Sequence, residues 1–381
     1  MPGKFEQHNN LLAEEPTFNP EQLNIIDKAI ADILKKGHVN ILKEVDNILH
    51  KEIALKLIEA GRDFYVAVNL YKFQDLNQEV ALKLIEAGKG YSVAENLDQF
   101  QGLDQEVALK LIEIGEGNYV AGSLDKFQGL DHKEIVLKII EEGQGVFSLV
   151  KCLDKFQGLD HKEIALKIIE AGKGNYVVDN LDKFQGLDQE VALKLIEAGK
   201  GVEVIENLNK FQGLDHKEIA LRLIEAGQGG GVANYLDQFQ GLDHKEIALK
   251  IIEEGQGEAV VRNLEEFQEL DHKEIALKII EAGKGNVVAA DLDKFQDLDH
   301  KEIALKIIEA RLGHYVAHYL DKFQGLDQEV ALKLIEIGRE SDVAQHLEEF
   351  QGLDHKKIAL KIIEAKKGDT VVENLEEFQG L

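Results

Sequence analysis

The sequence Phe-Gln-Gly-Leu-Asp recurs along the chain at a nearly constant interval, and a few copies carry Asp or Glu in place of the Gly. Neighbouring copies are 27 to 29 residues apart, measured between their first residues. Those residues are Phe73, Phe100, Phe127, Phe156, Phe184, Phe211, Phe239, Phe267, Phe295, Phe323, Phe350 and Phe378. A repeat of this length is typical of a solenoid, in which one small unit is stacked many times. The 381 residues therefore predict one elongated array rather than two or three globular domains.

Each repeat has the pattern of two short amphipathic helices, as the copy at residues 159–186 illustrates. Asp160 stands at a helix N-cap, and Glu163 three residues later is typical of a capping box. Apolar residues then recur at helical spacing as far as Gly172, a residue type that commonly ends helices. After a glycine-containing link, a second apolar series runs to Phe184. We predict an all-α fold, a right-handed superhelical α-solenoid of two-helix repeats with helices of roughly ten residues.

Small differences in repeat length indicate where the unit tolerates change. Repeats that begin Asp-Gln-Glu, at Asp104, Asp188 and Asp327, are 27 residues long, one fewer than those that begin Asp-His-Lys-Glu. One repeat is 29 residues long and contains Cys152, the only cysteine of the chain. We place its extra residue in the second helix and expect a bulge or a wider turn there.

The two ends of the chain differ from its middle. All three prolines lie within the first twenty residues, so we expect residues 1–19 to form a disordered polar leader. Residues 20–49 keep the helical pattern without the phenylalanine and are assigned to a degenerate N-terminal capping repeat. Residues 50–381 then hold twelve tandem repeats. The sequence stops directly after the last Phe-Gln-Gly-Leu, so we expect either a piece of a longer protein or head-to-tail self-association through an uncapped end.

Composition narrows the possible functions. The net charge of −27 repels polyanions and anionic membranes and favours basic partners. Serine and threonine are scarce, and a single cysteine excludes both an internal disulfide and a cysteine-based zinc site. We therefore expect no enzyme activity, no cofactor and no metal. The chain has no signal peptide and no stretch long enough to span a membrane, which favours an intracellular location.

A histidine recurs at the start of the first predicted helix. It is found at His132, His161, His216, His244, His272, His300 and His355. Stacking separates successive rings by about 10 Å, which is too far for them to share a metal ion. We expect these histidines to be exposed residues of the first helical turn rather than metal ligands or a pH sensor.

Variation among the repeats concentrates just after the glycine-containing link. The residue pairs at that place are Phe64-Tyr65, Tyr91-Ser92, Asn118-Tyr119, Val146-Phe147, Asn175-Tyr176, Val202-Glu203, Gly230-Gly231, Glu258-Ala259, Asn286-Val287, His314-Tyr315, Ser341-Asp342 and Asp369-Thr370. A second variable pair follows in the second helix, for example Asp179-Asn180, Asn234-Tyr235, Arg262-Asn263 and His318-Tyr319. Because these residues fall at the same place in every unit, stacking should align them in a ridge on the order of 100 Å long.

Aromatic residues are concentrated on this predicted ridge, and exposed aromatic side chains on a rigid frame are common interface hot spots. The candidate binding residues are Phe64, Tyr65, Tyr91, Asn118, Tyr119, Phe147, Asn175, Tyr176, Glu203, Tyr235, Arg262, His314, Tyr315, Tyr319, Asp342 and Asp369. We expect them to bind a protein or an extended peptide, and the acidic composition favours a basic partner. The alternatives are unconstrained drift and a structural spacer or assembly element. Drift explains the variability but not the aromatic bias, because unconstrained exposed positions favour polar residues.

The inter-helix link carries a resemblance to a known class of repeats. The sequence Glu-Ala-Gly-Lys-Gly at 170–174, followed by Asn175-Tyr176, resembles TAL-effector-like arrays, whose two-helix repeats are nearly identical and differ at a residue pair in this loop. The resemblance implies that each pair reads one base and that Lys173 contacts a phosphate. More broadly, the chain is similar to α-helical solenoids such as tetratricopeptide and HEAT arrays. Nucleic acid is therefore the second candidate partner, although the net charge of −27 disfavours it.

Overall fold

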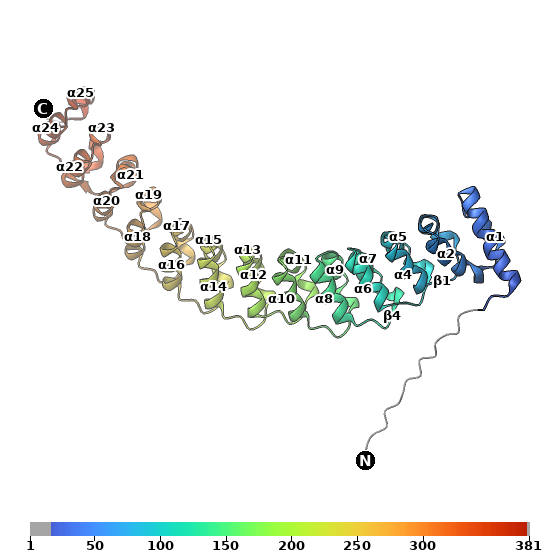
Figure 1. Ribbon diagram of the computed structural model, residues 1–381. Coiled ribbons are helices and arrows are strands. Elements are labelled where there is room, and N and C mark those ends of the chain that lie inside the picture. Colours follow the sequence, from blue (N-terminus) through green and yellow to red (C-terminus); the bar gives the residue numbers. More distant parts are fainter. Residues whose placement is uncertain (1–16, 379–381) are drawn as a thin grey trace, which may run out of the picture. The chain divides into compact units, whose positions relative to one another are not determined.

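Helices follow one another in pairs along residues 17–378, the part of the chain that the computed structural model describes (Figure 1). The long helix α1 comes first, and twelve pairs follow it, from α2 to α25. The predicted array of two-helix repeats is therefore confirmed. In each pair the even-numbered helix is here called helix A and the odd-numbered one helix B. Most of the leader expected at residues 1–19 lies outside the described residues.

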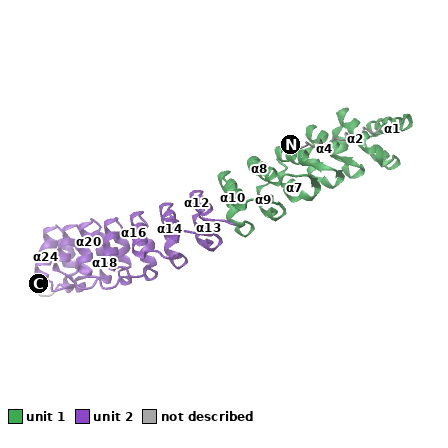
Figure 2. Ribbon diagram, turned by 90° about the horizontal axis from the view of Figure 1, so that it is seen from below, with its two compact units in different colours: residues 1–185 green, residues 186–381 purple. Residues whose placement is uncertain are grey.

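The chain forms two compact units, unit 1 (residues 1–185) and unit 2 (residues 186–381), which Figure 2 colours separately. In unit 1 the α-helices are α1 (Pro20–Lys36), α2 (His50–Glu59), α3 (Asp63–Ala67), α4 (Gln78–Glu86), α5 (Gly90–Glu95), α6 (Gln105–Glu113), α7 (Gly117–Gly122), α8 (His132–Glu142), α9 (Val146–Lys151), α10 (His161–Glu170) and α11 (Gly174–Val178). Its 3₁₀ helices are Asn40–Glu44, Asn47–Leu49, Leu70–Lys72, Leu97–Gln99, Leu124–Lys126, Leu153–Lys155 and Leu181–Lys183. Its two-residue strands are β1 (Leu76–Asn77), β2 (Phe100–Gln101), β3 (Leu103–Asp104) and β4 (Phe127–Gln128).

Unit 2 repeats the same order of elements. Its α-helices are α12 (Gln189–Glu197), α13 (Gly201–Glu206), α14 (His216–Glu225), α15 (Gly229–Asn234), α16 (His244–Glu253), α17 (Gly257–Arg262), α18 (His272–Glu281), α19 (Gly285–Ala290), α20 (His300–Glu309), α21 (Gly313–His318), α22 (Gln328–Glu336), α23 (Glu340–Gln345), α24 (His355–Glu364) and α25 (Gly368–Glu373). Its 3₁₀ helices are Leu208–Lys210, Leu236–Gln238, Leu264–Glu266, Leu292–Lys294, Leu320–Lys322, Leu347–Glu349 and Leu375–Glu377. Its strands are β5 (Leu326–Asp327) and β6 (Phe350–Gln351).

Helix A begins and ends where the sequence predicts. In α10, a side-chain oxygen of Asp160 accepts hydrogen bonds from the backbone N–H groups of Lys162 and Glu163 at 3.0 and 3.2 Å. The helix buries its apolar face, and Ile168 is fully enclosed, a burial worth roughly 1.5–3 kcal/mol. The chain then turns at Gly172, whose φ of 72° is left-handed and costs glycine little.

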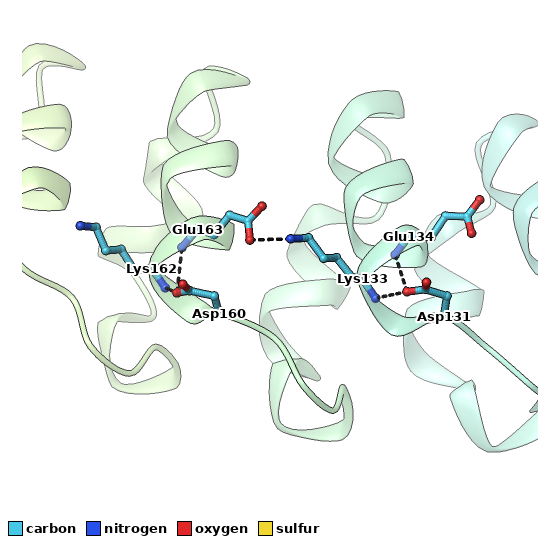
Figure 3. Close-up of polar contacts among 6 residues, drawn as sticks. All are labelled: Asp131, Lys133, Glu134, Asp160, Lys162 and Glu163. Atoms are coloured by element: carbon cyan, nitrogen blue, oxygen red, sulfur yellow. Dashed lines mark hydrogen bonds and ion pairs between the residues drawn. The ribbon is translucent and has the colours of Figure 1, made fainter. Parts of the chain in front are cut away.

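The glutamate of the predicted capping box forms a bond between repeats. The Glu163 carboxylate reaches the ammonium of Lys133 in the preceding repeat at 2.8 Å (Figure 3). Equivalent bridges join Lys51 to Glu79, Lys217 to Glu246, Lys245 to Glu274, Lys273 to Glu302 and Lys301 to Glu329. Each is partly exposed and contributes only about 0–1 kcal/mol, but together they give a structural reason for the constancy of Asp-His-Lys-Glu.

Helix B is shorter than the sequence predicts, and a 3₁₀ helix completes it. On α11, the backbone N–H of Asn180 donates to the carbonyl of Val177, three residues back, at 3.1 Å. The side-chain amide of Asn180 then donates to the carbonyl of Tyr176 at 3.0 Å. The side chain thus occupies the acceptor that a continuing α-helix would use, and Leu181–Lys183 winds more tightly.

The recurring histidine is part of the joint between the start and the end of each repeat. Nδ1 of His161 accepts a hydrogen bond from the backbone N–H of Gln185 at 3.1 Å, and its ring packs edge-on against Phe184 with centroids 6.4 Å apart. The same bond forms at His50, His132, His216, His244, His272 and His300, at 2.7 to 3.2 Å. These rings are half-buried or buried, so the expectation of exposed first-turn residues was wrong. Because a backbone N–H only donates, Nδ1 is unprotonated and the ring proton lies on Nε2.

Repeats without the histidine satisfy the same backbone group with a carbonyl. In unit 2 the N–H of Gln212 donates to the carbonyl of Leu187 at 2.8 Å, beside a parallel bridge between Asp188 and Gln212. The pairs β1 with β2, β3 with β4 and β5 with β6 have the same parallel register. The carbonyl of an extended residue before the cap thus replaces the imidazole nitrogen as the hydrogen-bond acceptor. These repeats do without the histidine and are one residue shorter. Asn77 caps a fourth repeat of this kind.

The extra residue of the 29-residue repeat lies in the link, not in helix B as predicted. Helix α9 has six residues, as most B helices do. Two residues, Gly145 and Val146, separate the link residue Gln144 from Phe147 at the start of helix B. In the other repeats one residue stands at that place, as Gly174 does between Lys173 and Asn175. Gly145 has a φ of 88°, and Val146 is buried. The turn is wider, as expected, and helix B keeps its length.

The N-terminal region 20–49 is also only partly as predicted. Its first helix, α1, has 17 residues and begins with a complete capping box between Asn19 and Gln22. The helical pattern of residues 39–49 leads not to a second α-helix but to the two 3₁₀ segments Asn40–Glu44 and Asn47–Leu49. Nε2 of His50 contacts the carbonyl of Leu42 at 3.1 Å and connects this region to the first repeat.

Candidate functional site

The variable residues lie at fixed positions on helix B. Counted from the first residue of each helix B, they are positions 2, 3, 6 and 7, together called here the variable face. In the 29-residue repeat the predicted pair is shifted by one, because Val146 is position 1 and Phe147 is position 2 of α9. On α11 they are Asn175, Tyr176, Asp179 and Asn180. Because successive B helices stack within each unit, position 2 of one repeat lies next to position 3 of the following repeat.

All sixteen candidate binding residues are accessible to some degree. The exposed ones are Phe64, Tyr91, Asn118, Phe147, Asn175, Arg262 and Asp369. The half-buried ones are Tyr65, Tyr119, Tyr176, Glu203, Tyr235, His314, Tyr315, Tyr319 and Asp342. Four other residues of the first variable pairs, those just after the link, are buried in the stack: Val146, Ala259, Val287 and Thr370. Variation at these four places therefore reflects packing between repeats.

Position 7 has a structural role in half of the repeats. An asparagine at this position donates its side-chain amide to the carbonyl of position 3 at 2.9 to 3.0 Å, as at Asn69, Asn96, Asn180, Asn207, Asn263 and Asn374. His346 makes the equivalent contact with Asp342. Asn180 and Asn263, predicted to belong to the variable pairs, are therefore part of the frame. Tyr235 and Tyr319 are the aromatic residues that replace this asparagine.

Aromatic side chains of neighbouring repeats pair with one another in unit 1. Tyr91 at position 2 meets Tyr119 at position 3 of the next repeat, with ring centroids 6.1 Å apart and an edge-to-face geometry. Phe147 and Tyr176 form a second pair of this kind at 6.2 Å. Phe64 contacts Tyr65 within one repeat at 6.2 Å. The residue at position 2 is the more exposed ring of each pair, since Phe64, Tyr91 and Phe147 are all more than half exposed.

Two carboxylates that the sequence analysis did not select flank the Tyr91–Tyr119 pair. Glu95, at position 6, accepts a short hydrogen bond from the hydroxyl of Tyr91, which raises the pKa of that phenol, and a hydrogen bond with Tyr119 adds to the shift. Burial raises the pKa of Glu116, and the charge of Glu95 raises it further. Glu116 occupies the link position that holds lysine in several repeats. The change from lysine to glutamate at this link position was the feature of the sequence that could have identified Glu116.

The variable face of unit 2 is flatter and more polar over its first four repeats. Glycine occupies both Gly230 and Gly231, and Glu258 pairs with Arg262 on its own helix at 2.7 Å. Aromatic residues return on α21, where the rings of His314 and Tyr315 lie 3.9 Å apart and those of His318 and Tyr319 lie 4.6 Å apart. Of the aromatic candidates of unit 2, all but Tyr235 therefore belong to α21 or its C-cap.

Other chemistry has little support in the described region. Among residues 17–378, no three His, Cys, Asp or Glu side chains are grouped so that they could hold a metal ion. Cys152 is half-buried at position 7 of α9. Within the same residues, no helix has both the length and the apolar character needed to cross a bilayer.

Comparisons with known proteins do not assign the chain to a family. No protein-family model matches it, and no curated protein is significantly similar to it. Among solved structures, one match is a "Circular tandem repeat protein with novel repeat topology and enhanced subunit contact surfaces". The two are 16% identical, the match covers 94% of this chain and 82% of the other, and the TM-score is 0.13. A similarity this distant does not identify a function.

Proposed function

We propose that this chain is a non-enzymatic binding scaffold, which recognises a protein or an extended peptide with a basic surface along the variable face. The observation that carries the proposal is the set of exposed aromatic side chains at position 2 in unit 1, two of which pair with a ring of the next repeat. Phe64, Tyr91 and Phe147 are 61%, 54% and 54% exposed. Leaving such rings in water is unfavourable, whereas burying them in an interface is favourable at about 25 cal/mol per Å².

The frame behind these rings supports a role in binding. Joints at the Phe-Gln-Gly turn and Lys–Glu bridges between A helices fix each repeat against its neighbours. A side chain held in place loses less entropy on binding, which is why rigid aromatic residues contribute strongly to interfaces. The right-handed superhelical twist expected from the sequence stays a prediction for each unit.

Charge supports a basic partner. Position 6 of the variable face carries exposed carboxylates at Glu95, Asp179, Glu206 and Glu373. A segment rich in lysine or arginine would approach this face under an attractive field, which accelerates association.

Nucleic acid recognition, implied by the resemblance to TAL-effector-like arrays, is the alternative. It would require free cations beside each variable pair. Three link cations are instead close to carboxylates: Lys89 to Asp63 at 3.2 Å, Lys200 to Glu203 at 4.0 Å and Arg339 to Asp342 at 4.0 Å. Retention of DNA or RNA on a filter at low salt would support this alternative, because phosphate contacts are strongest there. Assembly through stacked ends is a third possibility, and a concentration-independent mass in light scattering would remove it.

The proposal is tested by exchanging aromatic residues for alanine together. A peptide ligand is first selected on the full chain from a displayed random library. The triple variant Tyr119→Ala, Tyr176→Ala and Tyr315→Ala should then bind it at least about tenfold more weakly, since each ring removes contact area. A control variant carries Lys167→Ala, Lys194→Ala and Lys306→Ala on the outer face of the A helices. Unchanged affinity of the folded triple variant, checked by its thermal unfolding, would reject the proposal.

A further inference from the structure

We infer that Tyr91, Tyr119, Glu95 and Glu116 in unit 1 form a receptor for one cationic side chain, the ammonium of lysine or the guanidinium of arginine, supplied by the partner. This rests on the proposed function, because the partner is the one that binds the variable face. An edge-to-face pair of tyrosine rings beside two carboxylates suits a cation better than an anion or a neutral group, since the face of a ring and a carboxylate both attract positive charge.

The two carboxylates have no cation of their own. Among residues 17–378, neither Glu95 nor Glu116 takes part in an ion pair, and neither belongs to the helix-A bridges. The nearest lysines along the chain are engaged elsewhere. Lys89, the nearest to Glu95, pairs with Asp63 at 3.2 Å, and Lys110, the nearest to Glu116, pairs with Glu86 at 4.0 Å. The negative charge between repeats at this place is therefore uncompensated within the described chain, which is consistent with the mutual repulsion of the two glutamates.

The second aromatic pair of unit 1 shows what a cation does at such a place. Phe147 and Tyr176 occupy the same two places as Tyr91 and Tyr119 in their ring pair, at a centroid distance of 6.2 Å against 6.1 Å, with ring planes at 57° rather than 85°. Four residues after Phe147, at position 6, stands Lys151, and its ammonium lies over the Phe147 ring, 5.5 Å from the centroid. Lys72 approaches Tyr71 in a similar way, at 5.4 Å.

The residue at position 6 therefore distinguishes the two pairs. Lys151 supplies a cation to its own ring, so the Phe147–Tyr176 pair is internally satisfied. Glu95 stands at the equivalent place beside Tyr91 and supplies a carboxylate instead. The Tyr91–Tyr119 pair thus has every part of the arrangement except the cation, and a partner provides it.

The inference is tested with a peptide of five Arg-Gly units and with the same peptide carrying citrulline, a neutral isostere of arginine. Fluorescence anisotropy at low and high salt gives the affinities for the full chain. Wild type should prefer the arginine peptide at least about tenfold, and the preference should shrink as salt screens the charges. Glu95→Lys, which copies the arrangement around Lys151, should abolish the preference, and Glu116→Gln should reduce it.

Glu206→Lys is the matched control, because Glu206 is exposed at position 6 of α13 beside Val202 rather than an aromatic pair. It brings the same change of net charge to a place without rings, and it should leave most of the preference intact. Equal losses in Glu95→Lys and Glu206→Lys would overturn the inference in favour of a general charge effect. So would equal binding of arginine and citrulline peptides by wild type. The receptor can fail these tests while the triple tyrosine variant still loses its selected peptide. In that case the proposed function stands and only the receptor is rejected.

Discussion

The two units share one frame and differ on the face that it presents. In unit 1, Phe64, Tyr91 and Phe147 are exposed on α3, α5 and α9, and two aromatic pairs bridge neighbouring repeats. In unit 2, the corresponding positions of α15, α17 and α19 carry Gly230, Glu258 and Asn286. Helix A, its cap and the phenylalanine anchor are nearly unchanged in both.

The frame and the variable face can therefore change independently of each other. The contacts between repeats come from A helices, caps, joints and the buried side of helix B, so the exposed positions 2 and 6 of helix B change without disturbing the stack. Joints also differ between the units. Unit 2 holds a run of four histidine joints, at His216, His244, His272 and His300, whereas unit 1 contains both pairs of strand joints that involve β1 to β4.

The largest effect is expected where unit 1 departs from the common link. In Gly145→Ala, the new Cβ would lie 2.6 Å from backbone atoms of Gly117 and Asn118, and residue 145 has a φ of 88°. Backbone atoms give way less easily than the ends of side chains. We expect the free energy of unfolding, measured by chemical denaturation, to fall by about 3 kcal/mol.

Gly230→Ala in unit 2 is the variant to compare with Gly145→Ala in unit 1. Its Cβ would stand 3.8 Å from that of Ala259, an ordinary contact, within helix α15. Alanine favours helix over glycine, so this variant should be more stable by about 0.5–1 kcal/mol. A loss of stability in Gly230→Ala as large as that in Gly145→Ala would show that the close backbone approach at Gly145 does not distinguish the two sites.

A smaller effect is expected from the histidine joints of unit 2, and it depends on pH. Burial lowers the pKa of His300, and the charge of Asp299 offsets part of this shift. The ring also faces Phe323 and the backbone of Gln324, which are uncharged, while neighbouring Lys301 pairs with carboxylates. The neutral ring therefore contributes fully above about pH 6.5, the value in the unfolded chain, and its contribution declines as the pH falls through 6.5 toward the folded pKa.

His300→Asn isolates this contribution, because the amide oxygen of asparagine takes the place of Nδ1 as acceptor and does not titrate. Between pH 8 and pH 5, wild type should lose about 1 kcal/mol of unfolding free energy relative to the variant, the worth of one hydrogen bond. His318→Asn, at an exposed residue outside the joints, is the control. Identical pH profiles for the two variants would show that the joint does not sense protonation.

The smallest effect concerns the turn after helix A. Arg311 has a left-handed φ of 64° at the place where Gly172 has 72° in unit 1. Arg311→Gly should raise the free energy of unfolding by about 0.5 kcal/mol in thermal denaturation, because glycine adopts this conformation without strain. Gly172→Ala, whose Cβ would meet nothing within 4 Å, should lower it by a similar amount. A loss of stability in Arg311→Gly would mean that the arginine side chain outweighs the strain of its backbone.

Features governed by near neighbours were predictable from the sequence. The cap at Asp160, the left-handed turn at Gly172 and the anchor Phe184 follow rules that involve a few consecutive residues, and the structure has each of them. The accessible candidates on helix B were predictable too, because repetition itself showed which positions vary. Glu95 and Glu116 were missed because neither is unusual alone in a chain with this many carboxylates.

Features that depend on distant partners were not predictable. The Gln185 N–H bonds to His161, 24 residues earlier, and no local pattern distinguishes that ring from an exposed one. The capping glutamate Glu163 was predicted to fold back on its own helix, but Lys133 of the preceding repeat supplies a stronger, charged partner. The early end of helix B was missed because Asn180 is an ordinary polar residue until its carbonyl acceptor is placed.

The repeat, the pairing of helices and the varying positions follow from period and apolar spacing, which are properties of the chain alone. Which variable residues meet depends on how the repeats stack. Tyr91 and Tyr119 are 28 positions apart in sequence, yet stacking brings their rings to 6.1 Å. The physical reason is that a solenoid turns a sequence separation of one repeat into contact, so that chemistry between repeats appears only once the repeats are stacked.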